Sequence, residues 1–286
     1  MMPMDFRGRW ALITGASSGL GREMAGLLAR EHGANIIAVA RRADRLDELR
    51  RELEGDARVR VEPIVADLAV ADDVERVIHA AAAAATGGLY AAVLNAGVTY
   101  FGDYRRLAWA EFQKMLQVNV VSTVRLATQL IEQIEKTRQG GGLMLVASMA
   151  GVTPVPYQTA YSSTKAFIVH FGCGLWHELR GRGVSVTTYA PGGIATEMTA
   201  GERFGALRRW LVPVDYAARE GVEAFRSRQY LHIPGSMNRL GLRLVRLLPQ
   251  RFVTARVGAA YRRSLEMASA LASEGGAGLD GSANGS

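Results

Sequence analysis

The chain contains almost no cysteine and no long apolar run. Its single cysteine, Cys173, cannot form an internal disulfide, as expected of a protein in the reducing cytoplasm. No stretch reaches the roughly 18 consecutive apolar residues that a membrane-spanning helix needs. The start of the chain, Met1 to Trp10, lacks the basic, apolar and cleavable pattern of a secretory signal. We therefore expect a soluble, cytoplasmic protein.

Acidic residues are scarce in one part of the chain. The net charge is +7, and the stretch from Arg203 to Arg263 holds thirteen arginines but only three acids, Asp215, Glu220 and Glu223. Such a surplus can meet nucleic acid, an anionic membrane surface or a phosphate-bearing substrate. This stretch has neither a nucleic-acid recognition motif nor an aromatic stacking platform. We therefore expect no nucleic-acid partner and interpret the surplus as a solvated basic face.

The hydrophobic residues, 49% of the 286, are enough to bury one large core. Short apolar and β-branched runs alternate with longer helical patterns, which predicts parallel strands joined by crossover helices. We expect a single α/β domain, a three-layer, doubly wound parallel sheet of about seven strands with helices on both faces. The expected strands are Ala11–Thr14, Asn35–Ala40, Val59–Val65, Ala91–Leu94, Leu143–Ala147, Val184–Tyr189 and Tyr230–Ile233.

Two long segments are expected to be helices that cover this sheet. Glu111–Lys136 and Ala160–Arg180 carry apolar residues at three- and four-residue spacing. The apolar stripe from Phe167 to Leu179 fits a subunit interface and a buried monomer core equally well. The end of the chain, 273–286, has almost no apolar bulk, and we expect it to be disordered.

A glycine-rich segment follows the first expected strand. Gly15, Gly19 and Gly21 give the spacing GxxxGxG, and a helix is expected to begin near Arg22. A turn this close to a pyrophosphate favours residues without a Cβ, and the N-terminus of the helix offers free N–H groups to the anion. The spacing differs from the GxGxxG fingerprint, but a strand before and a helix after it indicate a dinucleotide phosphate loop.

The end of the second expected strand has no acidic residue. An NAD site usually places an acid there to bind the ribose 2′-hydroxyl. This chain has Arg41 and Arg42 instead, and a guanidinium group suits a phosphate, so we expect NADP(H) to be preferred over NAD(H). Arg41, nearer the strand end, is the first choice for the 2′-phosphate. Alternatively, one or both arginines only begin the solvated helix Ala43–Glu54.

Tyr161 and Lys165 lie four residues apart at the start of an expected helix, so their side chains project from one face. The pKa of a free phenol is about 10, and a neighbouring ammonium group lowers it by favouring the phenolate. We therefore expect Tyr161 to be the proton-transferring acid/base of a reaction at an alcohol or ketone carbon.

Ser148 and Asn119 add polar groups to this pattern. Ser148 follows the expected strand Leu143–Ala147, at the strand end where open α/β folds bind ligands, and its hydroxyl is expected to hold the substrate oxygen. Ordinary turn chemistry is the alternative for this serine. Asn119 lies in an apolar helical segment and needs a hydrogen-bond partner. A structural partner and a water chain leading to Lys165 both satisfy that need.

Together these residues resemble the short-chain dehydrogenase/reductase family over about residues 7–235. The resemblance implies a Rossmann-like fold, a catalytic tetrad of Asn119, Ser148, Tyr161 and Lys165, and no metal. The family's motifs occur here in order, and by this resemblance the cofactor-binding residues are Gly15, Ser17, Ser18, Gly19, Leu20, Gly21, Arg41, Arg42, Asp67, Leu68, Asn95, Ala96, Gly97, Tyr161, Lys165, Pro191, Gly192, Ile194 and Thr196.

The resemblance also implies roles for these residues. Tyr161 would give a proton to the carbonyl oxygen during reduction, Lys165 would also hold the nicotinamide ribose, and Asn119 would carry a proton relay. Asp67 would hydrogen-bond near the adenine, and Asn95 would support the cofactor and the central sheet. Thr196 would contact the nicotinamide amide or the pyrophosphate. A homo-dimer or homo-tetramer is implied as well.

The expected function is NADP(H)-dependent interconversion of a ketone or aldehyde and an alcohol, with reduction of a hydrophobic fatty 3-oxoacyl, steroid-like or aromatic carbonyl compound favoured. An NADP-binding sensor or scaffold without turnover is one alternative, but it would not need Ser148, Tyr161 and Lys165. An epimerase or dehydratase acting on nucleotide sugars is another. That class usually has a different glycine spacing and a larger substrate domain.

Substrate selectivity is expected to come from three segments, 98–104, 152–157 and 198–211. The last contains the bulky apolar residues Met198, Phe204, Leu207, Trp210 and Leu211. These residues fit either a lid over a lipophilic substrate or part of the core.

The expected dinucleotide-binding and catalytic domain is 7–235, and 236–272 is expected to continue it as a helical extension. Within that extension, leucines alternate with arginines from Leu240 to Leu248. A helix over the substrate cleft, a subunit contact and a weak peripheral contact with an anionic membrane are all open explanations.

Overall fold

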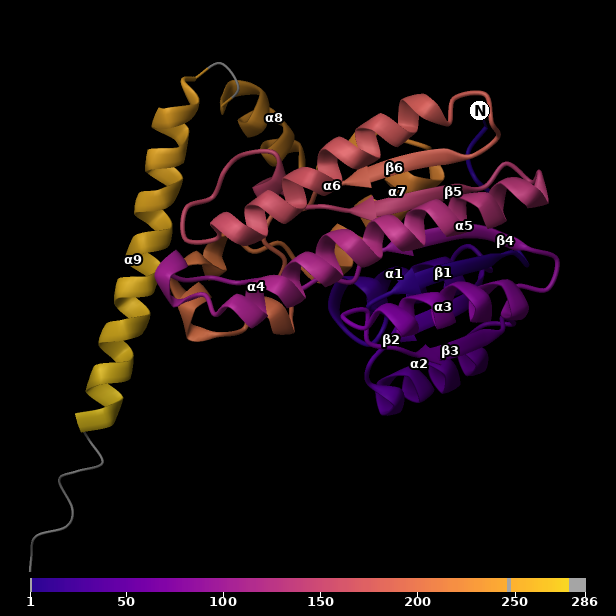
Figure 1. Cartoon of the computed structure of the whole chain (residues 1–286), viewed down its shortest axis with the longest axis horizontal. Coiled ribbons are helices and arrows are strands. Elements are labelled where there is room, and N and C mark those ends of the chain that lie inside the picture. The colour runs from indigo at the N-terminus through magenta and orange to yellow at the C-terminus, as the bar shows by residue number, and fades with distance from the viewer. Residues whose placement is uncertain (1, 246–247, 278–286) are drawn as a thin grey trace, which may run out of the picture.

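The computed structural model describes residues 2–245 and 248–277, and this part of the chain contains a seven-stranded, all-parallel sheet. Its strands lie in the order β3-β2-β1-β4-β5-β6-β7, with helices on both faces (Figure 1). The doubly wound α/β fold predicted from the sequence is confirmed. The strands are β1 (Trp10–Thr14), β2 (Asn35–Ala40), β3 (Val61–Val65), β4 (Leu89–Leu94), β5 (Gly142–Val146), β6 (Ser185–Tyr189) and β7 (Leu231–His232).

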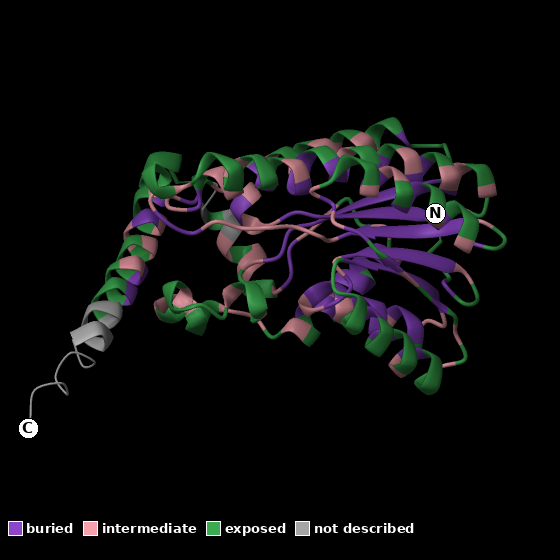
Figure 2. Cartoon of the chain, turned by 60° about the horizontal axis from the view of Figure 1, so that its bottom comes forward, coloured by how far each residue is buried: buried purple, intermediate pink, exposed green. Residues whose placement is uncertain are grey.

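The central strands are buried because helices cover both of their faces, and most of them are continuous apolar runs; β6, with Ser185, Thr187 and Thr188, is the exception. Every residue of β1, β2, β4, β5 and β6 is buried, and the sheet forms the purple interior of Figure 2. One face packs against α3 (Ala71–Ala84), α5 (Thr123–Thr137) and α6 (Thr159–Glu178). The other face packs against α1 (Gly19–Arg30), α2 (Ala43–Asp56) and α7 (Val214–Arg226).

The strand order places a crevice at the carboxyl ends of the strands. The chain runs from β1 to the edge strand β3, and β4 then pairs with the other side of β1. The segments that follow β1 and β4 therefore run in opposite directions away from these strand ends. Open α/β sheets bind their ligands at such a switch point.

One predicted helix is divided in the structure. The segment predicted as one helix, Glu111–Lys136, consists of α4 (Trp109–Leu116), a six-residue π-helix η2 (Gln117–Ser122) and α5. Asn119 lies in the π-helix, where its side chain is buried. A π-helical turn changes the direction in which side chains project and is common at functional sites. Apolar spacing alone does not reveal it.

The chain continues beyond the sheet as two helices, α8 (Ser236–Val245) and α9 (Gln250–Ala277). Figure 1 shows α9 crossing the end of the molecule toward which β5 and β6 point. It packs on η5 (Glu202–Trp210), a 3-10 helix. Its helical residues reach Ala277, into the segment predicted to be disordered, and 278–286 lie outside the described residues. In the described ranges, no helix is both long and apolar enough to span a bilayer.

A close backbone contact joins the end of β5 to α6. The short 3-10 helix η3 (Met149–Gly151) follows β5 and packs on α6. A Cβ on Gly151 would overlap the carbonyl oxygen of Lys165 in α6. Only glycine lets these two backbones approach so closely.

We predict that Gly151→Ala destabilises the protein by about 1 to 3 kcal/mol, because the added methyl forces η3 away from α6. Urea-induced unfolding measures this change. The matched control is Gly55→Ala in α2, where an added Cβ meets open space, and it should leave stability equal or slightly higher. Equal stabilities for the wild type and Gly151→Ala would contradict the packing described here.

Candidate active site

A cavity of 660 Å³ opens at the carboxyl ends of the central strands. It is lined by the glycine loop, the segments after β2, β3, β4, β5 and β6, the helix η5 and part of α9. Of the predicted site residues, Gly21 and Asn119 do not line it. The predicted residues that do are Gly15, Ser17, Ser18, Gly19, Leu20, Arg41, Arg42, Asp67, Leu68, Asn95, Ala96, Gly97, Ser148, Tyr161, Lys165, Pro191, Gly192, Ile194 and Thr196.

The glycine loop has the shape that a pyrophosphate site needs. Gly15 and Gly19 have positive φ angles of 70° and 53°, and a Cβ on Gly21 would overlap the carbonyl oxygen of Gly15. Ser18, the N-cap of α1, makes no side-chain capping bond, and the first turn of α1 carries no acid. The free N–H groups of that turn remain available to an anion. The loop therefore fits the phosphates of a dinucleotide.

Asn95 ties the loop to the central sheet. Its Nδ2 donates to the Thr14 carbonyl over 3.0 Å, and the backbone N–H groups of Asn95 and Ala96 donate to Thr14 Oγ1, each over 3.0 Å. These bonds join the ends of β1 and β4, the strands on either side of the crevice. The next residue, Gly97, lies against Asn119 and Lys165, since a Cβ there would be 3.3 Å and 3.4 Å from their polar atoms.

The two arginines after β2 point to different groups. Arg42, the N-cap of α2, reaches back to the glycine loop, with its Nε 3.4 Å and one terminal nitrogen 3.3 Å from Ser17 Oγ. Its other terminal nitrogen donates to Glu197 over 3.1 Å. Arg41 instead lies 4.0 Å from the carboxylate of Asp67. The structure thus brings Arg42, and not the first-choice Arg41, against the loop.

Asp67 and Leu68 follow β3 and are held by their own loop. Asp67 accepts the N–H of Ala69 over 3.0 Å, and the carbonyl oxygen of Leu68 accepts a hydrogen bond of 2.6 Å from Ser122. Ser122 belongs to the π-helix, so the segment after β3 is fixed to the element that carries Asn119.

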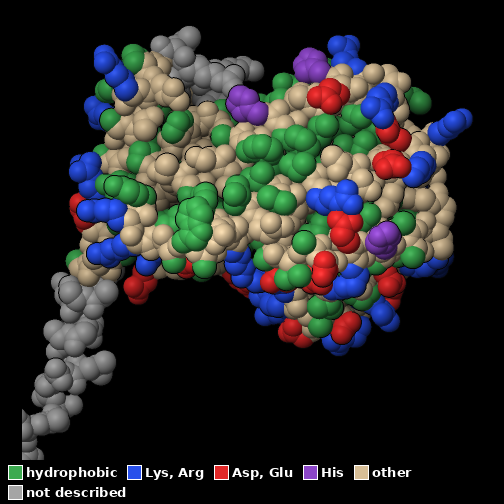
Figure 3. Space-filling model, viewed as in Figure 1, with side chains coloured by type: hydrophobic (Ala, Val, Ile, Leu, Met, Phe, Trp, Pro, Cys, Tyr) green, Lys and Arg blue, Asp and Glu red, His purple; other side chains and the backbone are tan. Residues whose placement is uncertain are grey.

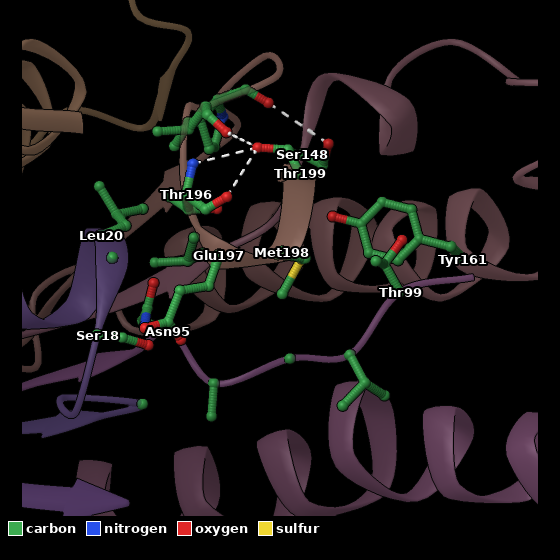
Figure 4. A pocket seen from close by; sticks show the side chains of 18 of the residues that line it. Ser18, Leu20, Asn95, Thr99, Ser148, Tyr161, Thr196, Glu197, Met198 and Thr199 are labelled. Atoms are coloured by element: carbon green, nitrogen blue, oxygen red, sulfur yellow. Dashed lines mark hydrogen bonds between the residues drawn. The ribbon is translucent and has the colours of Figure 1, made fainter. Parts of the chain in front are cut away.

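Tyr161 and Ser148 meet in the cavity. Figure 4 shows the Tyr161 hydroxyl pointing from α6 into the cavity, on the side where Ser148 lies. The Ser148 hydroxyl donates to the Pro191 carbonyl over 3.4 Å and accepts the N–H of Ala150 over 3.1 Å. Ser148 therefore does the turn chemistry that was the alternative explanation and also faces the cavity.

The pKa of Tyr161 moves against the expectation from the sequence. Burial raises the pKa of Tyr161 to about 12, the hydrogen bond with Ser148 acts in the opposite direction, and the nearby Tyr261 raises it further. The ammonium of Lys165 lies 5.9 Å from the centre of the phenol ring. The lowering of this pKa expected from Lys165 is not found; burial dominates, so this phenol keeps its proton at neutral pH.

Lys165 is buried beneath the phenol. Its Nζ donates to the carbonyl oxygen of Val146, the last residue of β5, over 2.9 Å. Burial lowers the pKa of Lys165 to about 8, because removing an ammonium group from water disfavours its charge. An ammonium group has three donors, so this hydrogen bond leaves donors for a ligand in the cavity.

Asn119 has structural partners. Its Oδ1 accepts the N–H of Val98 over 2.8 Å, while its Nδ2 donates to the Val98 carbonyl over 2.9 Å and to Thr164 Oγ1 over 3.0 Å. These bonds join the π-helix, the segment after β4 and α6. They hold Thr164 and therefore help to position Lys165, the residue that follows it. Of the two explanations left open for Asn119, the structural partner is observed.

The segment after β6 covers the glycine loop. Pro191 accepts the N–H of Met149 over 2.8 Å, and Ile194 forms a parallel bridge with Val212. Thr196 then caps the 3-10 helix η4 (Glu197–Thr199). A Cβ on Gly19 would lie 3.1 Å from the methyl of Thr196, so this segment and the loop enclose the cavity between them.

Part of the cavity lining is apolar. Five lining residues were predicted as either lid or core, and none of the five is buried, which favours a lid over the core. No residue of the expected segment 152–157 lines this cavity; Pro154, Pro156 and Tyr157 border a second hollow beside α9. The five lining residues are Met198, Phe204, Leu207, Trp210 and Leu211.

Several lining residues were not identified from the sequence. Glu197 pairs with Arg42, and Gln158 donates to Thr99 over 3.3 Å. Tyr261, with Val257 and Ala260, reaches the cavity from α9. The spacing of Val257 and Tyr261 along one helical face was the available signal, but a pattern does not tell which surface a helix covers.

Residues 9–205 match the family model described as short chain dehydrogenase. An uncharacterized oxidoreductase of Myxococcus xanthus (strain DK1622) is 40% identical over 196 residues, which cover 68% of this chain and 76% of that protein. Very-long-chain 3-oxoacyl-CoA reductase of Homo sapiens is 32% identical over 196 residues, 67% of this chain. The match spans 61% of the human protein, less than two thirds of its length.

The comparison with solved structures points to the same family. A short-chain dehydrogenase from Sphingobium yanoikuyae, solved in complex with NADPH, superposes with a TM-score of 0.74 at 27% identity. The superposition covers 84% of this chain and 93% of that chain. With a family model that spans the glycine loop and the Tyr161–Lys165 pair, these likenesses agree with the cavity described above. The chain belongs to the short-chain dehydrogenase family.

Proposed function

We propose that the protein is an NADP(H)-dependent oxidoreductase that reduces a hydrophobic ketone or aldehyde to an alcohol. The observation that carries this proposal is the Tyr161 hydroxyl, which lies beside Ser148 in the cavity that also contains the glycine loop. A proton donor and a dinucleotide phosphate site in one cavity are what carbonyl reduction requires. This combination favours turnover over a sensor or scaffold role.

In this proposal the residues of the chain manage the proton. Since its pKa is about 12, the Tyr161 hydroxyl is protonated at neutral pH and can donate to a carbonyl oxygen. Ser148 would hold the same oxygen, and the charge of Lys165 would stabilise the phenolate left behind. A bound reduced nicotinamide would supply the hydride.

The preference for NADP(H) rests on Arg42. Its guanidinium group borders the cavity next to Ser17 of the glycine loop, and no acid occurs at the end of β2. Arg41 borders the same region and can add a second positive charge. A planar guanidinium group binds a phosphate in a bidentate manner, which suits the 2′-phosphate of NADP(H). The Sphingobium relative bound to NADPH supports this assignment.

The substrate is proposed to be lipophilic, with a fatty 3-oxoacyl compound as the leading class. The apolar side chains of η5 that line the cavity support a hydrophobic substrate. The human relative's name, very-long-chain 3-oxoacyl-CoA reductase, favours this class over steroid-like or aromatic compounds. An epimerase or dehydratase role has no corresponding support.

We also propose that 7–235 form the catalytic unit, that 236–272 continue it, and that the protein is a homo-oligomer. Figure 3 shows hydrophobic side chains gathered over α4 and α6 on one face of the molecule. Trp109 is 70% exposed and Phe167 is 47% exposed on these helices. Burying such side chains against a second copy is favourable. The cytoplasmic location stays a prediction.

We predict that Tyr161→Phe lowers kcat for NADPH-dependent ketone reduction about a thousandfold, because the phenol is the proton donor. NADPH affinity, measured by fluorescence titration, should stay within about twofold of the wild type because the ring remains. Tyr230→Phe removes a phenol outside the cavity and is the matched control. Full turnover by Tyr161→Phe would refute the acid/base role.

Removing the Arg42 guanidinium group should change cofactor choice. We expect Arg42→Ala to weaken NADPH binding roughly 10- to 100-fold and to leave NADH binding unchanged, since only NADPH carries the 2′-phosphate. Steady-state KM and titrated Kd values for both cofactors measure the difference. Arg45→Ala, an exposed arginine of α2 paired with Glu48, is the control. An equal loss for NADPH and NADH would contradict this role.

The reduction should lose rate in mildly alkaline solution. Burial sets the pKa of Lys165 at about 8, so its ammonium is present below that pH and is lost as the pH rises through it. Tyr161 keeps its proton over the same range. We predict that kcat/KM for ketone reduction is level below about pH 8 and falls about tenfold per pH unit above it. A profile that stays level to about pH 10 would exclude this role for Lys165.

A further inference from the structure

Tyr261 brings a second phenol into the catalytic cavity. It lies on α9, beyond the residues 9–205 that the family model matches, and it lines the same cavity as Tyr161. Its ring packs at 5.1 Å, edge to face, on Phe101, and Phe101 packs at 5.0 Å on Phe204 of η5. The segment after β4, the 3-10 helix η5 and α9 therefore meet around this phenol.

Hydrogen bonds and packing of its neighbours hold Tyr261 in place. Ser264, one helical turn further along α9, is buried and donates to the Arg203 carbonyl over 2.6 Å. Arg203 in turn donates to the Phe101 carbonyl over 2.9 Å. On the same face of α9, Gly258 leaves space for Pro156, since a Cβ there would lie 3.0 Å from that ring. The phenol is held in place by this packing and not by its hydroxyl.

The Tyr261 hydroxyl has no hydrogen-bond partner within the described part of the chain. None of the hydrogen bonds among residues 2–245 and 248–277 involves it. Burial raises the pKa of Tyr261, so the hydroxyl keeps its proton and remains a donor at neutral pH. It is near enough to Tyr161 for the two phenols to interact electrostatically. The Tyr261 side chain is partly buried and borders the cavity, so a ligand there can accept a hydrogen bond from its hydroxyl.

We propose that Tyr261 is a substrate-positioning and specificity-determining residue that donates a hydrogen bond to a second oxygen of the substrate. The preferred substrates are then hydrophobic ketones that carry another carbonyl or ester oxygen close to the reacting one, as a 3-oxo ester or thioester does. The two phenols line one cavity and interact electrostatically, so one substrate molecule that carries two oxygens can contact both. This inference rests on the proposed function of Tyr161.

Two ketones of equal chain length test the inference. Ethyl 3-oxohexanoate carries the second oxygen, and 4-nonanone has the same chain without it. We expect Tyr261→Phe to lower kcat/KM about tenfold for the oxo ester, mainly through a higher KM, because one hydrogen bond is lost. The value for 4-nonanone should stay within about twofold of the wild type, because the ring still packs on Phe101.

Two controls separate the possible failures. NADPH affinity and melting temperature of Tyr261→Phe should match the wild type, since the ring and the fold remain. An equal loss on both ketones, or no loss on the oxo ester, overturns the role of Tyr261 and leaves the proposed function standing. A wild-type protein that reduces neither ketone with NADPH overturns both.

Discussion

The close contact between the start of α6 and the end of β5 is the constraint on which the site depends. Lys165 reaches the Val146 carbonyl at the end of β5, and Gly151 allows the turn after β5 to lie directly on the Lys165 backbone. This contact fixes Tyr161, one helical turn earlier, beside Ser148. The glycine loop and the segment after β6 then enclose the same space from the other side. The proposed catalytic and cofactor-binding groups meet because parallel strands end at one edge.

Burial affects the two titrating groups of this contact in opposite ways. It raises the pKa of Tyr161 to about 12 and lowers the pKa of Lys165 to about 8. Both shifts favour the neutral form, as expected where water is excluded. A neutral phenol is a proton donor, which suits reduction more directly than the phenolate expected from the Tyr161–Lys165 spacing. In the proposed reduction, the charge of the lysine would matter after the proton has left, when a phenolate must be stabilised.

Much of the fold and the site could be predicted from local patterns. Short apolar or β-branched runs between helical patterns predicted each of the seven strands within two residues of its observed bounds, including β3 and β7, which are only partly buried. Residues that directly follow such strands, for example Asn95 and Ser148, reach the cavity as a consequence of the topology. A pattern does not give the direction in which a side chain points: Arg42 faces the glycine loop, whereas its neighbour Arg41 faces Asp67. Long-range packing is equally hidden, as the position of α9 shows.

The central claim is that Tyr161 donates the proton to the substrate oxygen. A crystal structure of the wild-type protein with NADP⁺ and a bound alcohol product tests it most directly. The account requires the alcohol oxygen to lie within about 3.2 Å of both the Tyr161 and Ser148 hydroxyls, with the reacting carbon facing the nicotinamide. An alcohol oxygen bound by any other group, with Tyr161 turned away from it, would contradict the account.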